Sequence, residues 1–184
     1  MDTKEQFEAV IHSCRSLFDD KLKDYGASWR VMRPESITDQ LFIKVKRIRT
    51  LENKNAVLIG EGICEEFVAI VNYGIIGLIQ LQLGFSDCVD IDNRRALELY
   101  DFHVNRTKEL MYAKNHDYDE AWRCMRITSL TDLIFQKICR TKQIETNKGL
   151  TLVSEGIDAN YSDMINYSLF SLIKYEFEEK NRID

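Results

Sequence analysis

The sequence predicts an all-α protein, and three observations support this prediction. The chain has one Pro and eight Gly among 184 residues, which is too little turn chemistry for a sheet of many strands. Apolar residues recur at the spacing of a helix face along most of the chain. The composition, 45% hydrophobic and 30% charged, is typical of a folded globular protein rather than of a disordered chain.

An internal repeat is visible in the sequence. The stretch that begins at Asp24 returns from Asp117, with 13 identical residues in the first 29 aligned positions, where chance would give about two. After one inserted residue, the match continues from Glu61 against Glu155. The fold that this predicts is an internally duplicated helical bundle.

The repeat assigns residues 1–86 to a first unit and residues 87–184 to a second unit. No stretch rich in Gly, Pro or Ser separates them. We therefore expect two three-helix units that pack as one body.

The first predicted helix begins at Thr3, where Thr3 and Gln6 can form a capping box. Phe7, Val10 and Cys14 open a long apolar stripe at helical spacing. The helix is expected to end near residue 24, and Gly26 permits a tight turn there.

Two further helices complete the first unit. Ser36 is predicted to cap the second helix, which spans 36–51 and follows the extended chain at Pro34. The third is expected over 61–83, and Gly84 ends it. In the second unit, the corresponding helices are predicted over 92–116, 129–144 and 155–180.

Composition also narrows the function and location. The net charge of −5 argues against a protein that coats nucleic acid, although a local basic pocket for a phosphate remains compatible with it. The polar N-terminus has no secretory signal pattern, so we expect a cytoplasmic protein. Its five cysteines, without a CxxC motif, are expected to be reduced thiols that serve as small core residues: Cys14, Cys64, Cys88, Cys124 and Cys139.

Residues 67–86 carry no charge but contain Asn72, Gln80 and Gln82, which makes them a poor membrane span. We expect a helix buried in the protein, or an interface of a homodimer, and no membrane association.

Carboxylates recur on the predicted third helices. Glu61 and Glu65 are four residues apart and share a helix face, and the corresponding stripe of the second unit carries Glu155 and Asp163. Oxygen ligands of this kind suit Mg²⁺ or Mn²⁺. Alternatively, the first Glu of each helix favours a helix N-terminus and Glu65 is solvated.

Other polar residues recur at equivalent positions in both units. An Asn inside an apolar helix needs a hydrogen-bond partner or a ligand. The Lys and Arg of the second helix could bind a phosphate, or form salt bridges with carboxylates of the third helix. The Trp-Arg pair could stack on a nucleobase, or the Trp could pin its loop to the core. The residues concerned are Trp29, Arg30, Lys44, Arg47 and Asn72, and Trp122, Arg123, Lys137, Arg140 and Asn166. We expect the two copies to form two walls of one site.

The order of these residues resembles the nucleotide modification associated domain 1 family. The shared pattern is Asp-Tyr and Trp-Arg, then Asp, Lys and Arg, then Glu and Asn-Tyr on the third helix. Ala69 and Ala159 depart from it, because the family has acidic residues at these positions. Members tend to lie near genes for nucleotide or DNA-base modification. The family is also similar to MazG-type all-α pyrophosphohydrolases, which hold Mg²⁺ with Glu and Asp and cut between the α and β phosphates.

The resemblance implies that the protein handles nucleotides. One hypothesis is a Mg²⁺-dependent nucleoside triphosphate pyrophosphohydrolase, with Glu61, Glu65 and Asp163 as catalytic residues and Glu155 as a further metal ligand. A second is a binding or accessory module with a degenerate site. A third is a structural helical protein that forms dimers and whose charges serve as ion pairs. The partner expected in the first two is a nucleotide or a related phosphorylated small molecule.

Overall fold

The computed structural model describes residues 1–53, 62–153 and 155–179, and every regular element within these ranges is helical. The first unit contains α1 (Thr3–Tyr25), η1 (Ser28–Val31), α2 (Pro34–Glu52) and α3 (Ile63–Leu83). The second contains α4 (Asn93–Tyr118), η2 (Ala121–Cys124), α5 (Ile127–Thr146), α6 (Ile157–Ile173) and the π-helical turn η3 (Lys174–Glu179). The all-α prediction is confirmed.

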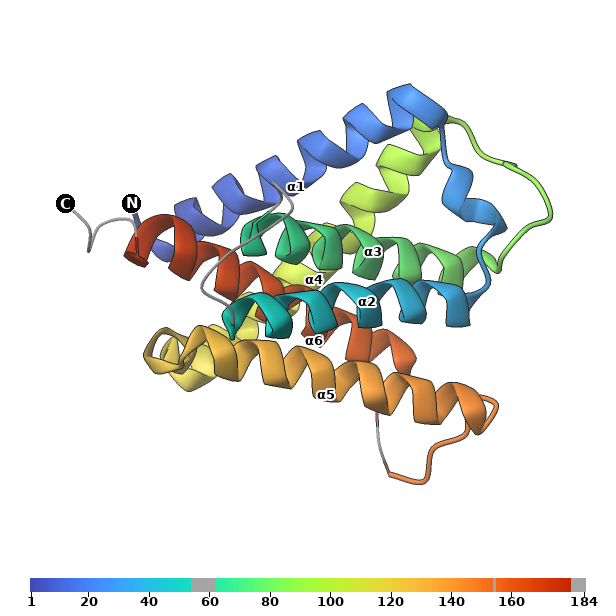
Figure 1. Cartoon of the computed structure of the whole chain (residues 1–184). Coiled ribbons are helices and arrows are strands. Elements are labelled where there is room, and N and C mark those ends of the chain that lie inside the picture. Colours follow the sequence, from blue (N-terminus) through green and yellow to red (C-terminus); the bar gives the residue numbers. More distant parts are fainter. Residues whose placement is uncertain (54–61, 154, 180–184) are drawn as a thin grey trace.

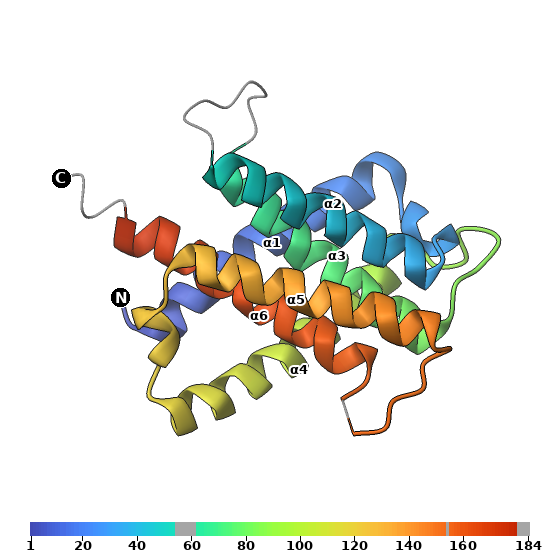
Figure 2. The same ribbon diagram turned by 60° about the horizontal axis from the view of Figure 1, so that its bottom comes forward.

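The helices form a bundle in which both units share one core (Figures 1 and 2). α3 and α6 pack against each other at the centre. α2 packs on α3, α5 packs on α6, and α2 and α5 also contact each other. α1 and α4 both contact the central pair, so each unit contributes the same three helices in the same roles.

Polar contacts between the units are reciprocal. Thr38 donates to Glu145 over 2.6 Å, and its repeat equivalent Thr131 donates to Glu52 over 2.7 Å. The second contact is the first one with the two units exchanged. The interface between the units therefore has the self-complementary form of a two-fold dimer.

Aromatic and charged contacts between α2 and α5 follow the same reciprocity. The rings of Phe42 and Phe135 pack with their centroids 5.8 Å apart. Two ion pairs flank them, Lys142 with Asp39 at 2.5 Å and Arg49 with Asp132 at 3.5 Å. Many residues that recur in the repeat therefore hold the two units together.

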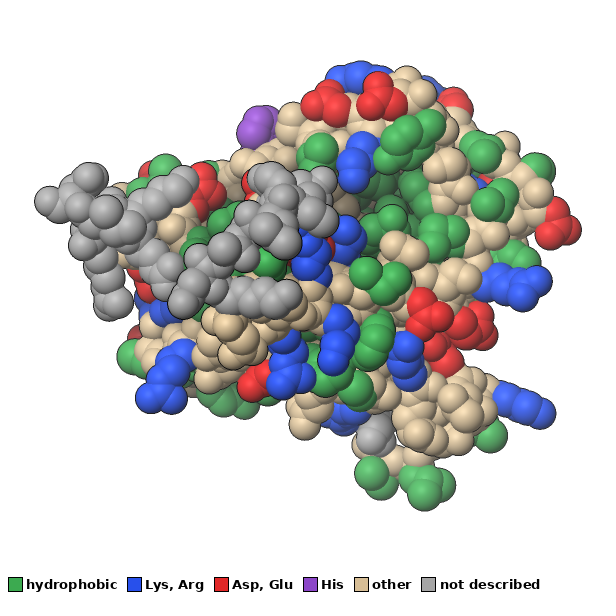
Figure 3. Space-filling model, in the orientation of Figure 1, with side chains coloured by type: hydrophobic (Ala, Val, Ile, Leu, Met, Phe, Trp, Pro, Cys, Tyr) green, Lys and Arg blue, Asp and Glu red, His purple; other side chains and the backbone are tan. Residues whose placement is uncertain are grey.

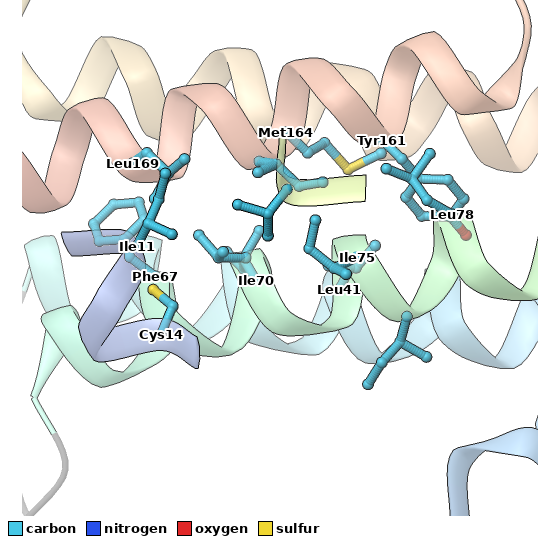
Figure 4. Packing of buried hydrophobic residues seen from close by; sticks show 14 of the residues in the cluster. Ile11, Cys14, Leu41, Phe67, Ile70, Ile75, Leu78, Tyr161, Met164 and Leu169 are labelled. Atoms are coloured by element: carbon cyan, nitrogen blue, oxygen red, sulfur yellow. The ribbon is translucent and has the colours of Figure 1, made fainter. Parts of the chain in front are cut away.

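The interior is built from aliphatic and aromatic side chains on α3 and α6, and side chains of the four other α-helices complete it. Figure 4 shows part of this core, with residues of α1, α2, α3 and α6. Gly74 and Gly77 let the two central helices approach closely, because an added Cβ at Gly77 would lie 2.8 Å from the ring of Tyr161. α3 is the one described helix that is long and apolar enough to cross a membrane, and 67% of its most apolar window is buried. It is therefore a core helix, as expected.

The structure corrects the predicted helix starts by one to two residues. Asp2, not Thr3, caps α1, and Glu5 completes the capping box. α2 begins at Pro34 and not at Ser36, because Pro suits the first turn of a helix, where its missing N–H is not needed. The helix ends were better predicted, since Gly26 and Gly84 both take positive φ values at C-caps.

The expectation that all five cysteines belong to the core was wrong. Cys14 is fully buried on α1, whereas Cys64, Cys88, Cys124 and Cys139 are exposed. None of the five forms a disulfide bond within the described residues. The four exposed cysteines lie on outer helix faces or in connections. The periodicity of the sequence wrongly predicted that their side chains point into the core.

Candidate functional site

Two of the cavities, one in each unit, are built from equivalent residues. The first cavity, about 270 Å³, lies between α1, η1 and α3. The second cavity, about 320 Å³, lies between α4, η2 and α6. Apart from Leu133, every residue lining the second cavity has its repeat equivalent in the wall of the first. The identical pairs are Lys21 and Lys114, Tyr25 and Tyr118, Trp29 and Trp122, Met32 and Met125, Asn72 and Asn166, and Tyr73 and Tyr167.

This arrangement differs from the single shared site that we expected, because each cavity is lined by residues of one unit only. Figure 3 shows a hollow with hydrophobic walls below α1, on the face where α1, η1 and α3 surround the first cavity.

A buried tryptophan lies in the wall of each cavity. Trp29 and Trp122 are each 6% exposed, and neither indole N–H has an acceptor among the described residues. Trp122 stacks on Phe170 with centroids 4.4 Å apart, and the guanidinium of Arg123 lies 4.4 Å from its ring centroid. The nearest ring contact of Trp29 is a tilted one with Phe18 at 6.4 Å. Trp29 is thus less covered by aromatic and cationic neighbours than Trp122.

The recurring asparagines connect the third helix of each unit to its first helix. Asn72 donates to the carbonyl of Cys14 over 3.1 Å and accepts from the hydroxyl of Tyr100 over 2.7 Å. Asn166 donates to the equivalent carbonyl, that of Thr107, over 3.4 Å. Its Oδ1 is buried without a donor in the described part of the chain. The repeat position of Tyr100 is Phe7, which lacks the hydroxyl group.

Asp163 is the acidic residue that lines the second cavity. Its carboxylate accepts from Lys114 over 2.8 Å and lies 2.6 Å from the ammonium of Lys137. Burial raises the pKa of Asp163, but the hydrogen bonds and charges of the two lysines outweigh it, so the pKa lies below its usual value. Asp163 is therefore ionised at neutral pH and already neutralised by the protein.

In the first unit a different carboxylate performs the pairing. Glu66 is 1% exposed, forms an ion pair with Arg47 and lies 3.3 Å from the ammonium of Lys44. Its repeat equivalent is Asn160, while the equivalent of Asp163 is Ala69. The buried carboxylate that pairs with α2 in the first unit and with α5 in the second therefore differs in position along its helix by about one turn.

The remaining predicted carboxylates lie apart from these pairs. Glu65 and Glu155 are exposed, and Glu61 lies outside the described residues. In the described ranges there is no group of three or more His, Cys, Asp or Glu residues that could hold a metal ion.

Among the predicted cations, Arg30 and Arg123 form ion pairs with acidic residues elsewhere in the chain. Arg30 is buried and contacts Asp90 at 2.7 Å and the carbonyl of Gly84 at 2.6 Å. Arg123 contacts Glu120 at 2.7 Å and Glu178 at 2.8 Å. Arg140, the equivalent of Arg47, is exposed, and Asn160 stands at the repeat position of Glu66.

The structure also identifies cavity residues that sequence reasoning missed. Lys21 and Lys114, together with the tyrosines of both walls, were not predicted as site residues, although their identity in the repeat was a visible signal. Glu66 was missed for another reason. Glu65 and Glu66 are adjacent, and only the packing of α3 shows which of them points inward.

The chain belongs to the nucleotide modification associated domain 1 family, which matches residues 21–81 and 114–175. The two matched segments cover well over half of the chain and fall one in each unit, consistent with tandem copies. Neither the curated proteins nor the solved structures contain a match to this chain.

Proposed function

We propose that this protein is a binding module for a nucleotide or a related phosphorylated small molecule. The observation that carries the proposal is the repeated cavity, in which both units place the same Trp, Tyr, Asn and Lys around a space of small-ligand size. The family association with nucleotide modification indicates the class of ligand.

The lining residues suit the parts of a nucleotide. Aromatic rings and a thioether can contact the faces of a base, as Trp29 and Met32 would in the first cavity. The buried indole N–H of Trp29 has no acceptor among the described residues and would gain one from a ligand carbonyl. Lys21 supplies a cation for a phosphate.

Hydrolysis with Mg²⁺ or Mn²⁺ remains a prediction that the described residues do not favour. The buried carboxylates, Glu66 and Asp163, are each held by two cations of the protein, which leaves them poor ligands for a metal. Glu65 is exposed and does not join them. The described side chains therefore do not make a metal site by themselves, and we derive no catalytic step through a metal.

Calorimetric titration of the full chain with canonical and modified nucleotides tests the proposal. We expect binding that persists in EDTA, without release of pyrophosphate or phosphate over hours. Pyrophosphate release that needs Mg²⁺ and is lost in Glu65→Ala would instead establish the hydrolase. If no nucleotide binds, the structural helical protein becomes the better description, and a homodimer can then be sought by sedimentation.

A further inference from the structure

The second unit shows how this fold holds a single anionic group. Asp163 on α6 lies in the wall of the second cavity, and Lys114 of α4 and Lys137 of α5 contact its carboxylate at 2.8 Å and 2.6 Å. Two lysines from two helices thus converge on one carboxylate beside the buried Trp122. The anion in this case belongs to the protein itself.

The first unit keeps both lysines but has no carboxylate at the position of Asp163. Lys21 and Lys44 are the repeat equivalents of Lys114 and Lys137, and the position of Asp163 is occupied by Ala69. Lys21 is exposed at the cavity wall and has no ion pair among the described residues. Lys44 is already paired with the buried Glu66, 3.3 Å from its Oε2, and does not line the first cavity. One cation without an ion pair in the described part of the chain, that of Lys21, therefore borders a cavity in which Ala69 stands at the position of the carboxylate.

We infer that the first cavity is the ligand site of this chain, and that it takes the phosphate of a nucleoside monophosphate beside Lys21 and Ala69. In the second unit the carboxylate of Asp163 occupies the corresponding place and closes the second cavity to anions. This inference rests on the proposed function and assigns it to one of the two cavities.

The chemistry of the first cavity fits such a ligand. Ala69 leaves room where the second cavity has a carboxylate, and the wall around it carries Trp29, Tyr73 and Asn72. An aromatic base can lie against these rings while the phosphate of the ligand contacts Lys21. The volume of about 270 Å³ is close to the lower end for small-molecule sites, which favours a monophosphate over a larger ligand.

The second cavity is unsuited to the same ligand at neutral pH. Asp163 is ionised and already neutralises both lysines, so a phosphate there would meet a negative charge without an unpaired cation. We therefore expect one ligand per chain rather than two.

The two tryptophans allow each cavity to be observed separately, because the chain has two Trp and one lines each cavity. Trp122→Phe leaves Trp29 as the reporter of the first cavity, and Trp29→Phe leaves Trp122 as the reporter of the second. Each variant is titrated with nucleoside monophosphates and with the parent nucleosides, and calorimetry on the unmodified chain gives the stoichiometry.

We expect one equivalent of monophosphate to bind, with a fluorescence change in Trp122→Phe and none in Trp29→Phe. Nucleosides should bind at least tenfold more weakly, as should the monophosphate to Lys21→Ala, since each change removes a charge-assisted hydrogen bond. Ala69→Asp should abolish binding by supplying an internal carboxylate. Lys23→Ala is the matched control, because Lys23 is an exposed lysine of α1 that pairs with Asp19 and does not line the cavity.

The outcomes separate the two proposals. If no nucleotide of the panel binds the unmodified chain, the proposed function fails and this inference fails with it. If nucleotides bind but Lys21→Ala and Ala69→Asp bind as tightly as the unmodified chain, only the inference is overturned. Two equivalents, or a response from Trp122 alone, would overturn it equally.

Discussion

Replacing Asp163 with Ala removes the acidic partner of two lysines and tests the energetics of the second cavity. Lys137 is 12% exposed, so it would keep a largely buried charge without its partner, at a cost of about 2 kcal/mol. Lys114 is 47% exposed and can return to water, which limits its loss to less than about 1 kcal/mol. The free energy of unfolding should fall by about 2–3 kcal/mol, which in a chain of this size lowers Tm by about 5–10 °C.

The pH dependence of this loss has a definite sign. The pKa of Asp163 is below its usual value in the folded protein, so its stabilisation is complete above the unfolded pKa near 3.9. It disappears as the pH falls through the lower folded pKa. The difference in unfolding free energy between the unmodified chain and Asp163→Ala should therefore be constant from pH 5 to 7 and narrow below pH 4.

Urea unfolding followed by circular dichroism measures both effects, with Asp132→Ala as the control. Asp132 is 66% exposed and pairs with Arg49 at 3.5 Å, so its loss should cost no more than about 0.5 kcal/mol. Equal destabilisation by the two variants would refute the assignment of Asp163 as a buried, doubly paired carboxylate.

Three further substitutions test other parts of the structure. Gly77→Ala should destabilise the protein by about 1–2 kcal/mol despite better helix propensity, because the new Cβ would lie 2.8 Å from the ring of Tyr161; a higher Tm would contradict the close helix packing. Tyr100→Phe should cost about 1–3 kcal/mol, since it leaves Asn72 Oδ1 buried without its donor, and an unchanged urea midpoint would argue against this bond. Burial and the charge of Arg106 lower the pKa of His103 to about 4, so the folded state resists its protonation, and stability should decline as the pH falls from 6.5 through 4. His103→Gln should flatten that decline in melts recorded between pH 7 and 4.

The fold was predictable from the sequence because its signals are local or repeated. The apolar stripes gave six helices, and Gly26 and Gly84 marked two helix ends, since they take backbone conformations that favour glycine. The starts were less accurate because several residues near a helix N-terminus can act as caps. At the start of α1, Asp2 took the role that Thr3 appeared to fill.

The site was predictable in kind and less so in detail. Trp29, Asn72, Trp122, Asn166 and Asp163 do line cavities. Which cavity each of these residues lines depends on which helices pack together, and the sequence alone did not predict that packing. The recurring arginines illustrate the same limit, because Arg30 and Arg123 look alike in the repeat and fasten different parts of the chain.

The sequence by itself determined the duplication, the helical class and the residue types that each unit presents. Those follow from periodicity and identity along the chain, which need no knowledge of distances between helices. Only the tertiary structure decided that Glu66 rather than Glu65 is buried, and that equivalent residues line a separate cavity in each unit. It also decided that Asp163 pairs with two lysines, whereas Ala69, at the equivalent position, carries no charge. The physical reason is that Asp163 meets both lysines only where α4, α5 and α6 bring their side chains within about 3 Å of one another, and these distances are a property of the packed bundle.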